Sequence, residues 1–444
     1  MTPSLMNNEV FISSIAAAAL AGLLFGFDTA VISGVTSDLR DLFALSPSAM
    51  GVTVSIALWG TLIGALCAGW LGDRYGSRDS LQLMAVLYFI SGVGCAIAWS
   101  WISLVTFRFI GGLAIGGSSV LAPVYISEIA PARRRGALVG LFQINIVVGI
   151  LVAYLSNYLV GQLNLGAHEW RWKLAVTAAP AALLFFMLIG IPRSPRWLVL
   201  RGRIDEARAA LARIGSLKIE SEFAEISAST AQYKADARAH LSWAHLRKPI
   251  FLAVAVAMFN QLSGINAILY YLNDIFASAG FGKVSSDLQA IAIGGTNLLF
   301  TIIAMAFIDR VGRKRLLLIG AVGTAVCLAC VAYIFANGVG QQFLIWTLIG
   351  FIAFFAFSQG AVIWVYISEI FPTAFRSRGQ SIGSGTHWFM CAVISLTFPA
   401  IAAQSQAAPF WFFAAMMALQ FVVVLFFFPE TKGVTLERMA EKMQ

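Results

Sequence analysis

The sequence predicts an all-α membrane protein: twelve transmembrane helices in two pseudo-symmetric six-helix bundles, with a short intracellular helical domain between them. Three observations support this fold class. Of the 444 residues, 59% are hydrophobic and 11% are charged, whereas soluble globular domains carry about 25% charged residues. The apolar residues gather in runs of about 20, the length of a membrane-spanning helix. The two halves of the chain also repeat each other. A water-soluble enzyme is therefore excluded.

Long runs without charge predict six helices in the first half, at residues 10–35, 50–71, 80–99, 102–127, 137–160 and 174–191. Six more are predicted at residues 249–273, 288–308, 316–336, 343–367, 379–401 and 409–428. Turns are expected from Asn337 to Gly340 and from Gln404 to Pro409. The predicted division is an N-terminal bundle (1–191), an intracellular helical linker (192–248), a C-terminal bundle (249–428) and a cytoplasmic tail (429–444).

The positive charges indicate the orientation of the chain. If both termini are cytoplasmic, 25 of the 30 Lys and Arg residues lie in inner loops, linker and tail. Four lie outside: Arg40, Arg171, Lys173 and Lys283. Membrane proteins carry this excess on the cytoplasmic side. The net charge of +9 is spread over many short loops, so it indicates topology and predicts no nucleic-acid partner.

Within the linker, Ile204, Ala207, Leu211 and Ile214 recur at helical spacing among charged residues. This pattern predicts a short amphipathic helix at the inner surface. It is interpreted as a solvated helical bracket, with contact to anionic lipid as the alternative. The five cysteines lie in apolar runs without the spacing of a zinc site or a disulfide framework, so we expect them to be packing residues.

Duplication is the strongest internal signal. The sequence V-Y-I-S-E-I occurs at residues 124–129 and again at 365–370, each time before a proline and arginines. The segments 73–78 and 309–314, D-R-Y-G-S-R and D-R-V-G-R-K, form a second pair. Duplicated bundles that rock about a central site are the general plan of secondary transporters.

Two charged residues lie inside predicted spans, where each costs about 3 kcal/mol or more. Asp28 is in the first span and Arg108 in the fourth. If these spans are neighbours, the ion pair keeps Asp28 ionised, and separating the two in a dry environment favours proton uptake. We interpret the pair as a proton-coupling switch. A static pair that holds the bundle together is the alternative.

Neutral amides and aromatic rings are the other conspicuous group within the spans. Amides exchange hydrogen bonds with hydroxyl groups and aromatic faces cover apolar ring faces, so the combination suits a polyol. Hydrogen bonding between helices is the alternative. The amides are Gln143, Asn145, Asn260, Gln261, Asn266 and Asn297, and the aromatic residues are Phe25, Tyr270, Tyr271, Trp364 and Trp388.

Charged residues at the inner ends of the spans predict a cytoplasmic gate. Glu128 and Glu369 end their spans beside arginines, and we expect salt bridges there that close this side in one state. The predicted gate residues are Asp73, Arg74, Arg78, Glu128, Arg135, Asp309, Arg310, Arg313, Glu369 and Arg376. The sequence contains no H-E-x-x-H, P-loop or nucleophile-elbow pattern, so no enzyme, ATP-driven pump, cofactor or metal site is expected.

These motifs resemble the sugar porter family of the major facilitator superfamily, from Phe25 to about Met439. The matching segments are Gly72 to Arg78 with its copy at 309–314, Arg108 with Gly111 and Gly112, S-P-R-W-L at 194–198, Q-L-S-G-I-N at 261–266 with Tyr270 and Tyr271, and P-E-T-K-G at 429–433. The resemblance implies the major facilitator fold, alternating access and a functional monomer in the lipid bilayer.

The resemblance also implies roles for individual residues. Asp28 matches the acid of proton-coupled bacterial and plant members, and Arg108 matches its partner. The positions that contact sugar in the family are occupied by Gln143, Gln261, Asn266, Asn297 and Trp364, with Phe25, Tyr271 and Trp388 around them.

Five departures from the family pattern stand out. Asn260 replaces the first glutamine of a usual pair, and His387 occupies a position that is commonly an amide. A neutral, hydrogen-bonding His387 is the favoured interpretation, with pH-dependent binding as the alternative. The segment Gly360 to Trp364 lacks the usual prolines, Arg193 replaces an acid, and Ser77 interrupts a basic pair.

We therefore predict a proton-coupled symporter of the bacterial inner membrane that imports a monosaccharide, either glucose or a similar hexose or pentose. The nearest alternative is a facilitative sugar or inositol-type polyol uniporter. A remote alternative is a sugar sensor that does not transport.

Overall fold

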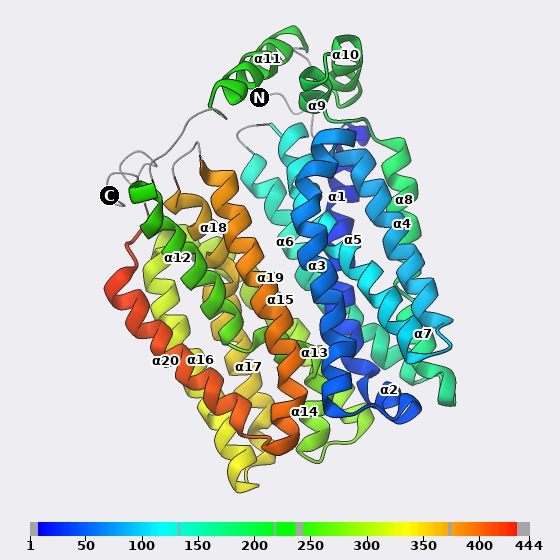
Figure 1. Cartoon of the computed structure of the whole chain (residues 1–444), viewed down its shortest axis with the longest axis vertical. Helices are drawn as coiled ribbons and strands as arrows, with labels where there is room; N and C mark the ends of the chain where they lie inside the picture. Colours follow the sequence, from blue (N-terminus) through cyan, green and yellow to red (C-terminus); the bar gives the residue numbers. More distant parts are fainter. Residues whose placement is uncertain (1–7, 132–133, 217–218, 237–242, 372–374, 433–444) are drawn as a thin grey trace. The chain divides into compact units, whose positions relative to one another are not determined.

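The computed structural model describes residues 8–131, 134–216, 219–236, 243–371 and 375–432. Over these residues the chain is helical without a strand, and twelve segments are long and apolar enough to cross a membrane, which confirms the predicted number (Figure 1). They are Glu9–Gly34, Pro47–Tyr75, Ser77–Ala96, Trp101–Ile129, Ala137–Gly161, Gly166–Gly190, Leu246–Tyr270, Lys283–Val311, Arg313–Asn337, Gln341–Ile370, Arg378–Gln404 and Ala408–Phe427.

The predicted spans were correct in position but often too short. The sixth begins at Gly166, and the eighth at Lys283. Glu169, Lys173 and Lys283, which interrupt the apolar runs, therefore lie inside helical segments. The predicted turns are confirmed: one helix ends at Asn337 before a left-handed Gly338, and another ends at Gln404.

The chain divides into two compact units. The first contains Met1–Asp28, Gly60–Gly149 and Leu174–His240, and the second contains Thr29–Trp59, Ile150–Lys173 and Leu241–Gln444. The division passes through helices α1 (Glu9–Val31), α3 (Pro47–Tyr75), α6 (Arg135–Gly161) and α7 (Glu169–Ala175). The ends of these helices that the charge pattern assigns to the outside thus belong to the same unit as the C-terminal half.

In the first unit, α4 (Ser77–Ala96) packs against both α5 (Trp101–Ile129) and α8 (Ala178–Gly190). Glycines let α3 approach α5 closely. A Cβ atom on Gly60 would lie 2.4 Å from the Phe109 carbonyl oxygen, and one on Gly64 would lie 2.3 Å from that of Leu113. Such distances are impossible for any larger residue, so these small residues fix the helix contact.

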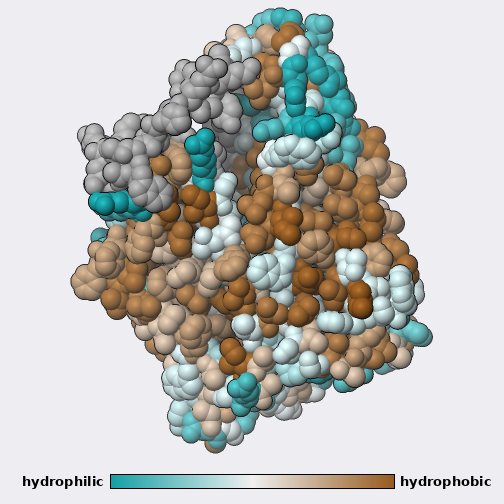
Figure 2. Space-filling view, in the orientation of Figure 1, coloured by the Kyte–Doolittle hydropathy of each residue, from teal (hydrophilic) through white to brown (hydrophobic). Residues whose placement is uncertain are grey.

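Three short helices continue the first unit beyond the spans: α9 (Pro195–Leu200), α10 (Ile204–Arg213) and α11 (Ile219–Asp236). Helix α10 buries Ala207, Ala210 and Leu211, which confirms the predicted amphipathic helix. The indole of Trp197 donates a 2.9 Å hydrogen bond to the carbonyl of Asp73, so α9 is fixed to the end of α3. Hydrophilic residues gather over α9 and α10, whereas the surface over α3 and α4 is mainly hydrophobic (Figure 2).

The second unit holds the remaining helices: α2 (Thr36–Phe43), α12 (Trp243–Leu262), α13 (Ile265–Tyr270), α14 (Leu272–Ser278), α15 (Lys283–Val311), α16 (Arg313–Asn337), α17 (Leu344–Phe355), α18 (Ala361–Ile370), α19 (Arg376–Gln404) and α20 (Ala408–Phe427). Helix α16 packs along α20, and α12 packs along α19. Two of its spans, the seventh and the tenth, are not continuous α-helices, and both interruptions adjoin the candidate site.

Candidate coupling pair and amide cluster

Asp28 and Arg108 come together in the first unit. Asp28 lies on α1 and Arg108 on α5, and the Arg108 Nη2 atom is 3.8 Å from the Asp28 Oδ2 atom. The side chains are 4% (Arg108) and 13% (Asp28) exposed. At 3.8 Å the contact is an ion pair without a short hydrogen bond between these two atoms. Two opposite charges thus face each other in a largely buried setting on two different spans.

The seventh span is broken where the amides are concentrated. Helix α12 ends at Leu262, and α13 begins at Ile265 after Gly264, whose φ is +79°. A side chain at Gly264 is excluded twice, because this φ disfavours L-residues and an added Cβ atom would lie 2.3 Å from the ring of Phe413. Discontinuous helices of this kind form the binding sites of many transporters.

The break brings three predicted amides into one hydrogen-bonded chain. Asn266 donates to the Gln261 side-chain oxygen at 3.0 Å, and Gln261 donates to the Asn260 side-chain oxygen at 3.1 Å. Asn260 and Gln261 are 4% and 1% exposed, and Asn266 is half-buried. Amides linked to one another in this way keep part of their donor and acceptor capacity for hydroxyl groups.

His387 joins this chain from α19. Its Nε2 and Nδ1 atoms lie 3.2 and 3.3 Å from the amide nitrogen of Gln261. Its ring centroid is 5.1 Å from that of Trp364 and 5.0 Å from that of Trp388. A neutral ring can accept the Gln261 hydrogen bond, as the sequence interpretation expected, and the three rings form a continuous aromatic surface beside the amides. We call Asn260, Gln261, Asn266, His387, Trp364 and Trp388 the amide cluster.

Other predicted residues border the amide cluster or lie apart from it. The Tyr271 hydroxyl donates to the Ser395 carbonyl on α19 at 3.0 Å. Tyr270 lies next to Cys391, whose sulfur also accepts from Asn266 at 3.1 Å. Asn297, on α15, is 8% exposed and accepts from Thr301 at 3.5 Å. Phe25, on α1, and Gln143, on α6, are half-buried members of the first unit.

Sequence reasoning missed Gln359. The tenth span changes from α17 to a π-helical turn at Ala356–Gly360 before α18. The segment that lacks the usual prolines therefore still begins with an irregular turn, formed by a π-helix. Gln359 is 1% exposed; its carbonyl accepts from Asn260 at 3.5 Å, and its side-chain oxygen lacks a hydrogen-bond partner among the described residues. A lone amide in an apolar run was the available signal.

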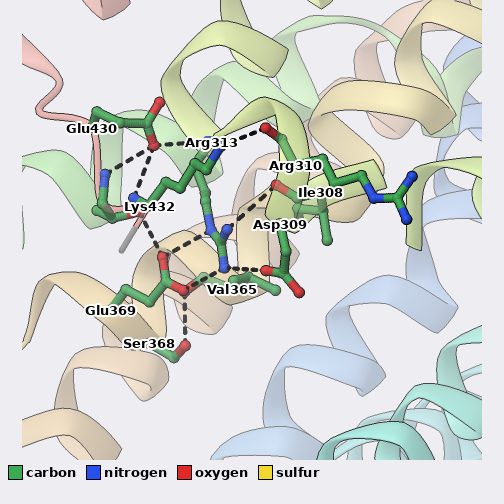
Figure 3. Close-up of polar contacts among 10 residues, drawn as sticks. Ile308, Asp309, Arg310, Arg313, Val365, Ser368, Glu369, Glu430 and Lys432 are labelled. Carbon is green, nitrogen blue, oxygen red and sulfur yellow. Dashed lines mark hydrogen bonds and ion pairs between the residues drawn. The ribbon is translucent and has the colours of Figure 1, made fainter. Parts of the chain in front are cut away.

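At the end of the second unit that the charge pattern assigns to the cytoplasm, Arg313 contacts several of the predicted gate residues (Figure 3). Its guanidinium lies 2.7 Å from Glu369 and 3.0 Å from Asp309. Glu430 accepts the backbone N–H groups of Arg313 at 2.9 Å and Lys314 at 3.2 Å, which caps the N-terminus of α16. Charge-assisted hydrogen bonds thus join the start of α16 to the end of α18 and to the segment that follows α20. Arg310 projects over the ring of Phe307 at 5.7 Å.

The equivalent end of the first unit is held differently. Glu128 accepts a 2.6 Å hydrogen bond from Ser77, the repeat counterpart of Arg313. Arg78 donates to the Leu188 carbonyl at 2.8 Å, and Arg74 lies 5.5 Å from the ring of Trp70. The side chains of Arg135 and Arg376 are outside the described part of the chain.

The unusual Arg193 also has a partner. Its guanidinium lies 2.8 Å from Asp79 in the first turn of α4. In the second half the acid is in the loop, at Glu430, and the bases Arg313 and Lys314 begin the helix. The loop is thus bound to the start of the helix in both halves, by an ion pair at Arg193 and Asp79 and by backbone hydrogen bonds to Glu430.

Comparison with known proteins decides the family. The family model "Sugar (and other) transporter" matches residues 14–443. The chain belongs to this family. The sugar transporter chain is 36% identical over 431 residues to the arabinose-proton symporter of Bacillus subtilis (95% of this chain, 92% of that protein). It is 35% identical over 471 residues to the D-xylose-proton symporter of Escherichia coli K12 (98% and 96%).

A solved structure confirms the major facilitator fold of this sugar transporter. The inward open conformation of the xylose transporter XylE from E. coli superposes with a TM-score of 0.88. That match covers 98% of this chain and 100% of the other at 33% sequence identity. The agreement extends over both sequence repeats.

Proposed function

We propose that this protein is a secondary active transporter that imports a monosaccharide together with a proton by alternating access. The buried pair of Asp28 and Arg108 carries the proposal. The described membrane interior offers no other acid within 4 Å of a base from a different span of the first unit. Relatives named as arabinose-proton and D-xylose-proton symporters support the same assignment.

The pair suggests how the proton is linked to the sugar. With Arg108 near, Asp28 is held as a carboxylate; when α1 and α5 separate, the carboxylate loses its counter-charge and takes a proton from the outside. The neutral Asp28 can then cross to the inward-facing state without burying an unpaired charge, which would be costly. Release of the proton on the inner side restores the pair.

We propose that the sugar site is built from amide and aromatic side chains of the membrane spans. Amides bind the hydroxyl groups and aromatic rings cover the apolar face of the sugar. The contact residues would be Phe25, Gln143, Asn260, Gln261, Asn266, Tyr271, Asn297, Trp364, His387 and Trp388. The amide cluster, whose six residues contact one another within the second unit, supports this proposal.

The cytoplasmic gate is proposed from the same set of residues that the sequence indicated, including Asp73, Arg74, Arg78, Glu128 and Arg135 in the first half. The set in the second half is Asp309, Arg310, Arg313, Glu369 and Arg376. The ion pairs of Arg313 support a gate at this end. These pairs can exchange partners when the bundles move.

We propose that the protein works as a monomer in the bacterial inner membrane, with both termini in the cytoplasm and no enzymatic step. The bundles would be residues 1–191 and 249–428, joined by the helical linker 192–248 and followed by the tail 429–444. The distribution of Lys and Arg supports this orientation.

The test is whether sugar addition to energised cells or proteoliposomes alkalinises the outer medium. A symporter must move protons inward with sugar, whereas a facilitative sugar or polyol uniporter transports without a pH change. Competition against labelled glucose by xylose, arabinose, galactose and inositol identifies the substrate. Saturable sugar binding without any flux would instead indicate a sensor.

A further inference from the structure

The few basic residues that the charge pattern assigns to the outside are not scattered in the structure. Arg40, Lys173 and Lys283 lie at the outer ends of α2, α7 and α15, all within the second unit. Three acids lie on the same helices, Asp38, Glu169 and Asp287, and a fourth, Asp274, lies on α14. Cytoplasmic loops, not outer ones, are where such charges normally collect, so their concentration here needs an explanation.

Lys283 connects segments from opposite halves of the sequence. Its amino group lies 3.3 Å from Asp38 on α2 and 3.1 Å from Glu169 on α7. Arg40 makes a parallel contact, donating a 3.0 Å hydrogen bond to Asp274 on α14. Each bond therefore joins an N-terminal helix end to a C-terminal one.

Behind these contacts is a buried layer. Lys173 is 0% exposed; its amino group lies 2.8 Å from Glu169 and donates to the Gly34 carbonyl at 3.0 Å. Asp287 is 4% exposed and accepts from Asn273 at 2.5 Å. A buried ammonium group is tolerated only while its partners stay in place, so the layer fixes Glu169 where Lys283 reaches it.

The backbones are also in contact at this end. The Tyr154 hydroxyl of α6 donates to the Leu269 carbonyl of α13 at 3.1 Å. A Cβ atom on Gly51 of α3 would lie 2.1 Å from the Leu396 carbonyl oxygen of α19. Helices from the two halves of the sequence are therefore closely packed within this unit.

We propose that Lys283 and Arg40, with Asp38, Glu169 and Asp274, form an extracellular latch that must open in every transport cycle and that sets the affinity for external sugar. Rocking of the bundles separates the N-terminal from the C-terminal helix ends, and every latch bond spans that separation. The latch stabilises the outward-closed state. Its strength determines the fraction of protein that can accept sugar from outside.

This inference rests on the proposed transport function, and it gives a kinetic signature. The apparent affinity for a ligand falls in proportion to the fraction of protein in the competent state. Weakening the latch raises the outward-open fraction, so the KM for uptake falls while the KM for efflux does not. Damage to the fold would lower Vmax or raise both constants.

The first test is Lys283→Met, which keeps the length of the side chain and removes its charge. We expect the KM for uptake to fall about fivefold, the size expected for loss of a partly exposed ion pair. The matched control is Arg171→Met, which removes another outer cation, one whose guanidinium lies over the Trp170 ring at 4.4 Å. Its KM should not change. An unchanged uptake KM in Lys283→Met overturns the proposal.

The second test is a charge exchange. Arg40→Asp places two acids together and should open the outer end, and adding Asp274→Arg restores an attractive pair and the original KM. Spin labels at the exposed residues Leu42 and Val284, 51% and 55% accessible, measure the opening without sugar, after replacement of the five cysteines. If the distance between the labels increases in Arg40→Asp but no variant transports sugar, the latch is supported and the proposed transport function is rejected. If the distance does not increase, the latch is rejected.

Discussion

Glu128 accepts a hydrogen bond from the Ser77 hydroxyl at 2.6 Å, whereas its repeat counterpart Glu369 is bound by the Arg313 guanidinium at 2.7 Å. In one copy of V-Y-I-S-E-I the glutamate accepts from a hydroxyl group and has the charge of Arg196 nearby, and in the other it is paired directly with a guanidinium. Because a charge-assisted pair is stronger and its partial burial makes an orphaned acid costly, the two inner ends differ in strength.

Substitution at the two repeat positions should reveal this difference. Arg313→Met leaves Glu369 and Asp309 without their cation, and we expect a loss of about 2–3 kcal/mol of stability. Ser77→Ala removes one hydrogen bond and should cost about 1 kcal/mol. Thermal melting of both variants in the same detergent measures the order. Equal melting temperatures of the two variants would contradict the predicted difference in strength between the two ends.

His387 is expected to act through its ring nitrogens as well as its flat face. His387→Phe keeps an aromatic ring between Trp364 and Trp388 but removes the acceptor for the Gln261 amide. A buried donor left unpaired costs about 1–3 kcal/mol, so the KM for sugar should rise about tenfold with little change in Vmax. His168→Phe, at an exposed histidine, is the control. Wild-type kinetics in His387→Phe would limit the residue to stacking.

Replacement of Gln359 should keep or raise the stability of the protein and at the same time weaken sugar binding. Its buried side-chain oxygen lacks a partner among the described residues, so Gln359→Met removes an uncompensated polar group. We expect a melting temperature equal to or above that of the wild type and at the same time a weaker affinity for sugar. Melting curves and uptake kinetics on one preparation test both parts. Unchanged affinity would remove Gln359 from the site.

The number and approximate positions of the spans could be predicted because each span is one continuous apolar run in the sequence. The residues at which the spans begin and end could not be predicted in this way. The sequence placed Lys283 and Glu169 in loops, yet both begin helices and they form an ion pair across 114 positions of the chain. A hydropathy window does not contain a partner from a distant helix.

The candidate site was predictable in composition and less so in geometry. The spacing of Asn260, Gln261 and Asn266 indicated a polar cluster, but the hydrogen-bonded order depends on the break at Gly264, which the run 249–273 concealed. The π-turn that contains Gln359 has no proline, so no local sign of it appears in the sequence. The ion pair of Arg193 and Asp79 joins residues 114 positions apart, so the sequence alone did not indicate it.

The central claim is that Asp28 couples sugar movement to the proton. The most direct measurement is sugar accumulation by proteoliposomes with an inward proton gradient, comparing wild type, Asp28→Asn and, as a control, Asp41→Asn at an exposed carboxylate of α2. One proton per sugar supports about tenfold accumulation for each pH unit. Asp28→Asn should reach only the external concentration while keeping sugar counterflow, and the control should accumulate normally. Accumulation by Asp28→Asn at the wild-type level would contradict the account.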